Sequence, residues 1–426
     1  MIKIIKDNIT IEVQKICNRL SLQDRPEEKT VKEILKDVRE HKNAALLKYT
    51  NKFDGVALEH LDIDFMEYEG AYTDIPDDVL VSLRLAIKNI AEFHIKQIPD
   101  SWEKNILKSS KLAWRYTPLQ RVGIYVPGGT AAYPTSVLMS AVPAKIAGVQ
   151  EIVMVTPPNK KGKINPLVLA AAKEVGINEI YKIGGAQSIA ALAYGTETIK
   201  PVDKIVGPGN IYVSLAKKLV AGICGIDKLA GPSDVLVIAD NTANPVFIAA
   251  DMLAQAEHDT LASSILVTTS EAIAKRVRQE IEKQIPALER RKIIEKSLKD
   301  YGLIILVKDV NKMIEVANMI APEHLEIMTE NAELVAEKIK NAGAIFIGDY
   351  SPVALGDYIA GPNHVLPTGG TARFDSPLSV LDFLKATSIV KFSESTLHAY
   401  SADIEKLAIL EGLQAHAVSA AIRLKK

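Results

Sequence analysis

The sequence is poor in cysteine, which leaves little room for thiol chemistry. Only Cys17 and Cys224 occur in 426 residues, and neither belongs to a CxxC pair. We interpret both as ordinary thiols of a reducing cytoplasm. A catalytic thiolate is the alternative, but the residues around Cys224, VAGICGIDK, offer no obvious base.

Net charge and long apolar runs are also lacking. The net charge is −1, so nothing points to nucleic acid or to an anionic membrane surface. No apolar run approaches the ~18 residues that span a bilayer, and the opening MIKIIKDNIT lacks a signal-peptide core. We expect a cytoplasmic protein with neither nucleic acid nor membrane as a partner.

What the chain does have is enough apolar material for a large core. Hydrophobic residues make up 48%, and the length suggests about two to four domains at ~100–200 residues each. The first ~100 residues show helical spacing of apolar positions, and the last 50 also read as helix. The sequence thus predicts helical segments at both ends of a globular chain.

From about residue 119, short apolar runs alternate with helical patterns. The expected strands are RVGIYVP, EIVMVTPP, EIYKIGGA, KIVGPGN, SDVLVIAD, SILVTTS, YGLIILVKD, LEIMT and GAIFIGDY. Strands that are apolar on both faces and separated by helices indicate parallel sheets covered on both sides. These units are too many for one small sheet, so we predict an α/β fold with two such domains.

Three glycine turns follow expected strands: YVPGGT (125–130), IGGAQS (183–188) and VGPGN (206–210). Ligands of open α/β sheets bind at such strand ends, and a helix N-terminus suits a phosphate. None of the turns matches GxGxxG. They indicate either tight βα turns or, taken together, a nucleotide site of unusual form.

Two further stretches carry polar side chains near expected element ends. Ser233 follows a Gly–Pro turn without a GxSxG elbow, so we interpret it as a hydrogen-bonding turn residue rather than a nucleophile. Asn244 and Pro245 predict a helix start. Gln255 and His258 lie three apart near its end and share a face. A histidine favoured there by the helix dipole is the alternative interpretation.

An acid–base pair follows a helix break in NMIAPEHLEI. Pro322 pushes Ala321 away from helical angles, so we place Glu323 and His324 in a connector before the strand LEIMT. Neighbouring side chains of extended backbone point in different directions. The pair could serve two protons around one cavity, or could form an ordinary surface turn.

The remaining polar candidates lie towards the C-terminus. Asp357 and His364 belong to a long glycine-rich loop, GDYIAGPNHVLPTGGTARF. Glu411 and His416 are five apart, about 140° around a helix axis, so one straight helix cannot aim both at one atom. Two histidines, an aspartate and a glutamine form a borderline ligand set that suits zinc and could accept manganese or cobalt.

Eight long motifs, in order, resemble the histidinol dehydrogenase family over roughly residues 119 to 423. They are GIYVPGGTAAYP, GGAQSIAALAYGTE, VDKIVGPGN, AGPSDVLVIAD, DMLAQAEHD, APEHLEI, GDYIAGPNHVLPTGGTARF and EGLQAHAVSAAIR. The first ~110 residues resemble the family only loosely. Asp259 and Asp234 depart from its usual glycine and glutamate, and neither is a proposed ligand.

The resemblance implies two Rossmann-like domains related to aldehyde dehydrogenases, with terminal segments used for dimerisation. We expect four parts: an N-terminal helical arm (1–24), a discontinuous metal and catalytic domain (25–118 with 234–372), an NAD-side domain (119–233), and a C-terminal helical segment (373–426) that reaches the partner subunit.

The resemblance also implies roles for individual residues. Zinc would be held by Gln255, His258, Asp357 and His416, the last from the partner subunit. Glu323 and His324 would be the catalytic pair. Substrate would contact these six residues together with Ser233 and the partner's Glu411. NAD would contact Tyr125, Gln187 and Asn210, and His364 would lie near the substrate.

The implied activity is the four-electron oxidation of L-histidinol, through its aldehyde, to L-histidine by a cytoplasmic zinc- and NAD-dependent homodimer. This would be the final step of histidine biosynthesis. A zinc hydrolase without a nucleotide and a non-catalytic metabolite-binding protein are the alternatives.

Overall fold

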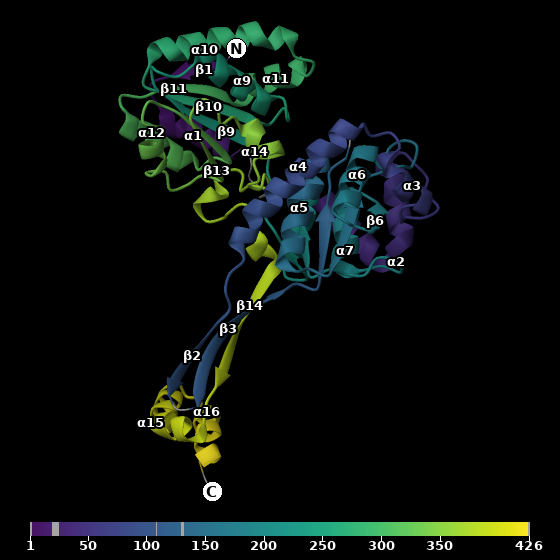
Figure 1. Ribbon diagram of the computed structural model, residues 1–426, viewed down its shortest axis with the longest axis vertical. Helices are drawn as coiled ribbons and strands as arrows, with labels where there is room; N and C mark the ends of the chain where they lie inside the picture. The colour runs from purple at the N-terminus through teal and green to yellow at the C-terminus, as the bar shows by residue number, and fades with distance from the viewer. Residues whose placement is uncertain (1, 19–24, 108, 129–131, 425–426) are drawn as a thin grey trace.

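The computed structural model describes residues 2–18, 25–107, 109–128 and 132–424. The molecule is elongated, with two α/β bodies and a slender arm that ends in the C-terminal helices (Figure 1). The two bodies contain most of the predicted site residues.

The first body is built on a six-stranded parallel sheet with the order β1-β11-β10-β9-β12-β13. Its strands are β1 (Lys3–Ile5), β9 (Asp234–Ala239), β10 (Ser263–Thr268), β11 (Gly302–Leu306), β12 (His324–Met328) and β13 (Ala344–Ile347). Its helices are α1 (Ile9–Asn18), α9 (Pro245–Ala256), α10 (Glu271–Gln284), α11 (Arg291–Tyr301), α12 (Val310–Ile320), α13 (Ala332–Ala336) and α14 (Val353–Tyr358). Helices α9 to α11 pack on one face and α1, α12 and α13 on the other.

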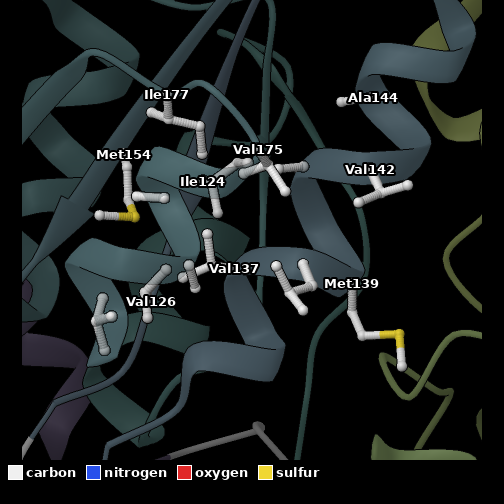
Figure 2. Packing of buried hydrophobic residues seen from close by; sticks show 14 of the residues in the cluster. Ile124, Val126, Val137, Met139, Val142, Ala144, Met154, Val175 and Ile177 are labelled. Atoms are coloured by element: carbon white, nitrogen blue, oxygen red, sulfur yellow. The ribbon is translucent and has the colours of Figure 1, made fainter. Parts of the chain in front are cut away.

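The second body has a five-stranded parallel sheet with the order β6-β5-β4-β7-β8. Its strands are β4 (Arg121–Tyr125), β5 (Glu151–Thr156), β6 (Glu179–Lys182), β7 (Lys204–Val206) and β8 (Gly225–Ile226). Its helices are α2 (Glu27–Asp54), α3 (Phe65–Glu69), α4 (Asp77–His94), α5 (Pro134–Ala147), α6 (Pro166–Glu174), α7 (Gly185–Tyr194) and α8 (Ile211–Val220). Figure 2 shows Ile124 of β4 and Met154 of β5 packed with Val137 of α5.

The predicted pair of parallel α/β sheets is confirmed, and every expected strand listed from the sequence is present. These strands can be recognised in the sequence because a strand that is buried on both faces consists of a continuous apolar run. The packing of residues 25–97 differs from the expectation, however. Helices α2 and α4 bury their apolar stripes against the five-stranded sheet, not with residues 234–372.

The expected N-terminal helical arm also differs from the structure. Residues 3–5 form β1, which pairs with β11 at the edge of the six-stranded sheet, and α1 packs on that sheet. Residues 1 and 19–24 of that expected segment lie outside the described residues. The N-terminus is therefore an integral part of the first body.

The arm consists of an antiparallel sheet with the order β14-β3-β2 and two terminal helices. Its elements are β2 (Trp102–Leu107), β3 (Ser110–Pro118), β14 (Leu384–Lys391), α15 (Glu394–Leu410) and α16 (Gln414–Ala421). The C-terminal segment is thus not purely helical, because β14 precedes its helices. Within the described ranges, no helix is both long and apolar enough to cross a bilayer.

Candidate active site

The predicted acid–base pair lies at the amino edge of the six-stranded sheet. Strands β9 and β12 are parallel neighbours, and His324 pairs with Val235. Helix α12 ends at Ile320, and its C-cap Ala321 adopts left-handed angles (φ 49°, ψ 62°) immediately before Pro322. The helix break is where the sequence predicted it, but His324 is already the first residue of β12 rather than part of a connector.

The Glu323 carboxylate is fixed from the neighbouring strand. Its Oε2 accepts hydrogen bonds from the Ser233 hydroxyl and, at 3.0 Å, from the backbone N–H of Asp234. The Glu323 N–H in turn donates to Asp234 Oδ1 at 2.9 Å. Burial raises the pKa of Glu323 to about 7, although the charge of His324 opposes the shift. A carboxyl group with this pKa can exchange protons near neutrality.

The His324 ring has one occupied nitrogen and one free nitrogen. Nδ1 lies 3.1 Å from the Asp234 carbonyl oxygen, to which it donates in the neutral tautomer, and 3.7 Å from Glu323 Oε2. Nε2 lies 3.7 Å from Asp357 Oδ1 and has no hydrogen-bond partner among the described residues. Burial alone would lower the pKa of His324, but the charges of Glu323 and Asp357 raise it to about 9.

Helix α9 delivers two donor residues to the same edge. The helix starts beyond the carboxyl end of β9, with the Asn244 side chain accepting from Val246 N–H at 3.0 Å. It then runs back along the sheet, so Gln255 lies in its last turn. His258 lies two residues beyond the helix end, in a turn closed by its N–H on the Gln255 carbonyl at 3.3 Å.

Asp357 of α14 connects the donor residues to His324. Burial opposes its ionisation, but the nearby His324, His364 and His258 together hold the pKa of Asp357 below its usual value. His364 Nδ1 lies 3.1 Å from the Asp357 carbonyl oxygen. The structure therefore brings Asp357, His258, His324 and His364 into one electrostatically coupled group.

The three residues of the expected nucleotide site line one cavity of about 740 Å³. Tyr125 ends β4, Gln187 lies in the first turn of α7, and Asn210 caps α8 with its side chain. The Tyr125 hydroxyl accepts from Gly185 N–H at 3.3 Å. Gly129 and Thr130 of the first glycine turn lie outside the described residues.

Glu411 and His416 are not near these groups within one chain. Glu411 caps α15 and His416 lies in α16, the helices at the far end of the arm (Figure 1), and both residues are exposed. Helix α15 ends before Glu411, and α16 begins at Gln414 after Gly412 with φ 74°. The break is consistent with the sequence argument that one straight helix could not aim both residues at one atom.

Comparison with known proteins agrees with this arrangement. The family model described as histidinol dehydrogenase matches residues 17–424. The chain is 54% identical to the histidinol dehydrogenase of Clostridium acetobutylicum, over 93% of this chain and 92% of that protein. It is 52% identical to that of Bacillus subtilis, over 93% of both. The crystal structure of histidinol dehydrogenase from Elizabethkingia anophelis superposes with a TM-score of 0.94 at 37% identity, covering 99% of this chain and 98% of that one.

The chain belongs to the histidinol dehydrogenase family. The resemblance seen in the sequence is therefore confirmed, and the protein is an oxidoreductase enzyme.

Sequence reasoning missed two acidic residues of this candidate site. Asp234 was noticed only as a departure from the family pattern, yet it exchanges hydrogen bonds with Glu323. Glu326, which is 1% exposed, accepts from Val353 N–H at the start of α14 at 2.9 Å. Neither role has a signature in the sequence, because both depend on contacts between segments that are apart along the chain.

Proposed function

We propose that this enzyme oxidises L-histidinol through L-histidinaldehyde to L-histidine, using zinc and two molecules of NAD in turn, as a cytoplasmic homodimer acting at the last step of histidine biosynthesis. The observation that carries the proposal is the Ser233–Glu323–His324–Asp357 chain of contacts, in which Glu323 and His324 are buried and Asp357 lies near His258. It combines proton acceptors with metal donors at one edge.

The donor residues fit a zinc ion. Gln255 is 3% exposed, and its buried side-chain Nε2 has no hydrogen-bond partner in the described part of the chain. The amide assignment is interchangeable, so its oxygen can point to a metal. Among the described residues, no group of three or more His, Cys, Asp and Glu side chains is placed to hold a metal. In our proposal one chain supplies the Gln255 amide, His258 and Asp357, only two of which are of these residue types. Zinc normally takes four ligands, so a further one is needed.

The fourth ligand is proposed to be His416 of a second copy. The arm exposes large apolar side chains around this residue, with Leu410 76%, Leu407 62% and Val418 52% exposed. Large exposed apolar side chains on two helices that pack together support a protein interface here. In a twofold dimer, each arm would reach the other chain's site, bringing Glu411 to the substrate together with His416.

In the proposed mechanism, bound zinc would hold the substrate amine and imidazole, and NAD would take up the hydride. The neutral form of His324, which grows as pH rises towards the pKa of about 9, takes the hydroxyl proton at Nε2 in the first oxidation. This nitrogen has no hydrogen-bond partner among the described residues. Glu323 then takes a proton from the water that adds to the aldehyde. After His324 has released its first proton to solvent, it accepts a second one as the hydrate gives up the second hydride. Ser233 and Asp234 hold the Glu323 carboxylate in place throughout.

The alternatives explain less of the structure. A hydrolase leaves the cavity lined by Tyr125, Gln187 and Asn210 without a purpose, and a passive binding protein does not need the Glu323–His324 pair. We find no observation that favours either alternative.

The decisive experiment counts NADH formed per histidinol consumed, with and without a chelator. We expect two NADH, and loss of activity after metal removal that added zinc restores. A ratio of zero, or a rate unchanged by complete metal removal, contradicts the proposal.

A second arm of the experiment separates the two oxidations. Glu323→Gln should reduce turnover by about 10²- to 10⁴-fold, the usual contribution of a general base, and should release trappable aldehyde. The exposed Glu333→Gln on α13 is the charge-matched control and should behave as wild type. Equal loss in both variants, or no aldehyde from Glu323→Gln, would remove the assigned role of Glu323.

A further inference from the structure

The wall of the 740 Å³ cavity contains an acidic residue that local structure does not explain. Asp54 is the last residue of α2 and lines the cavity together with Tyr125, Gln187 and Asn210. A carboxylate at the C-terminal end of a helix opposes the helix dipole. Nor does Asp54 cap the helix, because Gly55 takes the left-handed position and donates its N–H to Asn51.

One oxygen of the Asp54 carboxylate also lacks a donor. Its Oδ2 is buried and has no hydrogen-bond partner among the residues that the structure describes. The nearby cation, Lys160, donates its Nζ to the Asp54 backbone carbonyl at 3.0 Å and not to the carboxylate. Burial raises the pKa of Asp54 to about 6, with Lys160 opposing the shift. The group is therefore mostly ionised at pH 8, and its Oδ2 has only the nearby charge of Lys160, and no hydrogen bond from a described residue, to stabilise it.

An unpartnered buried carboxylate reduces the stability of a fold, so its presence in a ligand cavity points to a donor on the ligand. A dinucleotide offers paired donors in the vicinal hydroxyls of its ribose. Carboxylates bind the ribose diol in this way in other dinucleotide folds, and a 2′-phosphate removes one hydroxyl and adds negative charge.

We infer that Asp54 accepts the hydroxyl groups of the adenosine ribose and makes this enzyme selective for NAD over NADP. The inference rests on the proposed function, because it takes the cavity to be the dinucleotide site. Repulsion between the carboxylate and the 2′-phosphate, in a cavity only partly open to water, supplies the discrimination.

The test compares kcat/KM for NAD and NADP, at saturating histidinol, in wild type and Asp54→Asn. We expect wild type to prefer NAD, and Asp54→Asn to lose about 10- to 100-fold with NAD, mainly through KM, as for one lost hydrogen bond to a charged group. The NAD-to-NADP ratio should narrow by at least about tenfold. An unchanged ratio in a folded Asp54→Asn enzyme overturns the inference.

Two further variants and one analogue sharpen the result. The exposed Asp74→Asn changes the same charge outside the cavity and should leave the ratio as in wild type. Lys160→Gln should leave the preference for NAD intact, and a reversal would assign discrimination to the lysine instead. The hypoxanthine analogue of NAD lacks the adenine amino group, and wild type should use it as well as NAD. Discrimination against this analogue that Asp54→Asn abolishes would place Asp54 on the base and overturn the ribose assignment.

Binding measurements keep this inference separate from the proposed function. Calorimetric titration of NAD and NADP into wild type and Asp54→Asn requires no turnover. If wild type fails to oxidise histidinol but still binds NAD in preference to NADP, and the variant does not, the proposed function fails while the inference stands. If histidinol is oxidised and both proteins bind the two dinucleotides with the same preference, only the inference fails.

Discussion

At the scale of single residues, the site is defined by how the Glu323 and His324 side chains are held. The sequence predicted that neighbours in extended backbone would serve different protons. In the structure the two side chains are in contact through His324 Nδ1, 3.7 Å from Glu323 Oε2, while Nε2 is directed to Asp357. The two nitrogens therefore have different surroundings, which a spacing argument could not reveal because Asp234 and Asp357 come from distant segments.

Glu326 provides a residue-scale prediction about pH. Burial, and then the proximity of Asp251, raise the pKa of Glu326, and burial likewise raises the pKa of Asp251. A carboxyl group whose pKa is raised by folding stabilises the protein below its unfolded pKa and loses that contribution as pH rises through the folded pKa. The pair should therefore reduce stability progressively between pH 5 and pH 8.5.

Glu326→Gln tests this directly. Glutamine keeps the acceptor for Val353 N–H but cannot ionise, so the variant should gain about 1–2 kcal/mol over wild type at pH 8.5 relative to pH 5. Urea unfolding at the two pH values measures the difference. A pH dependence identical to that of wild type would show that the pair does not titrate in this range.

The cysteines provide a second residue-scale prediction. Burial raises the pKa of Cys224 to about 11, which keeps it a thiol at neutral pH, and Cys17 packs at the edge of the core between α1 and its sheet. A Cys17→Ser/Cys224→Ala enzyme should keep turnover within about twofold of wild type, because no thiolate takes part. Complete loss of activity in a folded double variant would require a thiol in the chemistry.

At the scale of elements, a buried ion pair fixes the loop between β7 and α8. Gly207 donates its N–H to Asp227 at 2.8 Å and accepts from Lys217 Nζ at 3.0 Å, and the two charged side chains pair with each other. Its φ is 110°, and a Cβ there would lie 2.2 Å from the Tyr125 carbonyl oxygen. The pair thus sets the distance between the loop that carries Asn210 and the strand that carries Tyr125.

Removing one charge of the Lys217–Asp227 pair should reduce the stability of the fold more than removing both charges. Lys217→Met leaves Asp227 buried and uncompensated, so we expect a loss of about 3–5 kcal/mol of stability. Lys217→Met/Asp227→Asn should recover part of it, because the asparagine oxygen still accepts from Gly207. Urea unfolding of the two single variants and the double variant gives the coupling. Strictly additive losses would show that the two side chains act independently.

The elements that sequence reasoning predicted are those with burial on both faces. Strands such as β9 and β10 are buried at every residue, and their largely apolar composition made them predictable. Strand β2 is exposed at every residue, so the arm sheet had no apolar signature, and β14 was absorbed into an expected helical segment. Asp54 and Glu326 were missed for a related reason, because their surroundings come from parts of the chain far away in sequence.

At the scale of the whole molecule, the question is whether one site needs two chains. The arm carries Glu411 and His416 away from their own body (Figure 1), so a His416→Ala chain and an Asp357→Ala chain should each be inactive as homodimers. A purified heterodimer should regain about half of wild-type activity, since one of its two sites receives intact ligands from both chains.

Differently tagged chains allow the heterodimer to be isolated and assayed. A heterodimer of His416→Ala with His258→Ala serves as a second complementing pair. Pairing Asp357→Ala with His258→Ala should give no recovery, because each site would lack one ligand of its own body. Full activity of either single variant would mean that each site is built from one chain. A lack of activity in the confirmed complementing heterodimer would mean the same.

The edge strand β1 has a consequence for synthesis on the ribosome. Lys3 pairs with Leu303. The first strand to leave the ribosome therefore has no pairing partner until about three hundred further residues have been translated. Until then the nascent N-terminus has no sheet to join, and the six-stranded body can close only late. Deleting residues 1–7 should leave β11 as an unpaired edge strand that can pair with other chains. We expect the deletion to cause aggregation during expression before it lowers the catalytic rate.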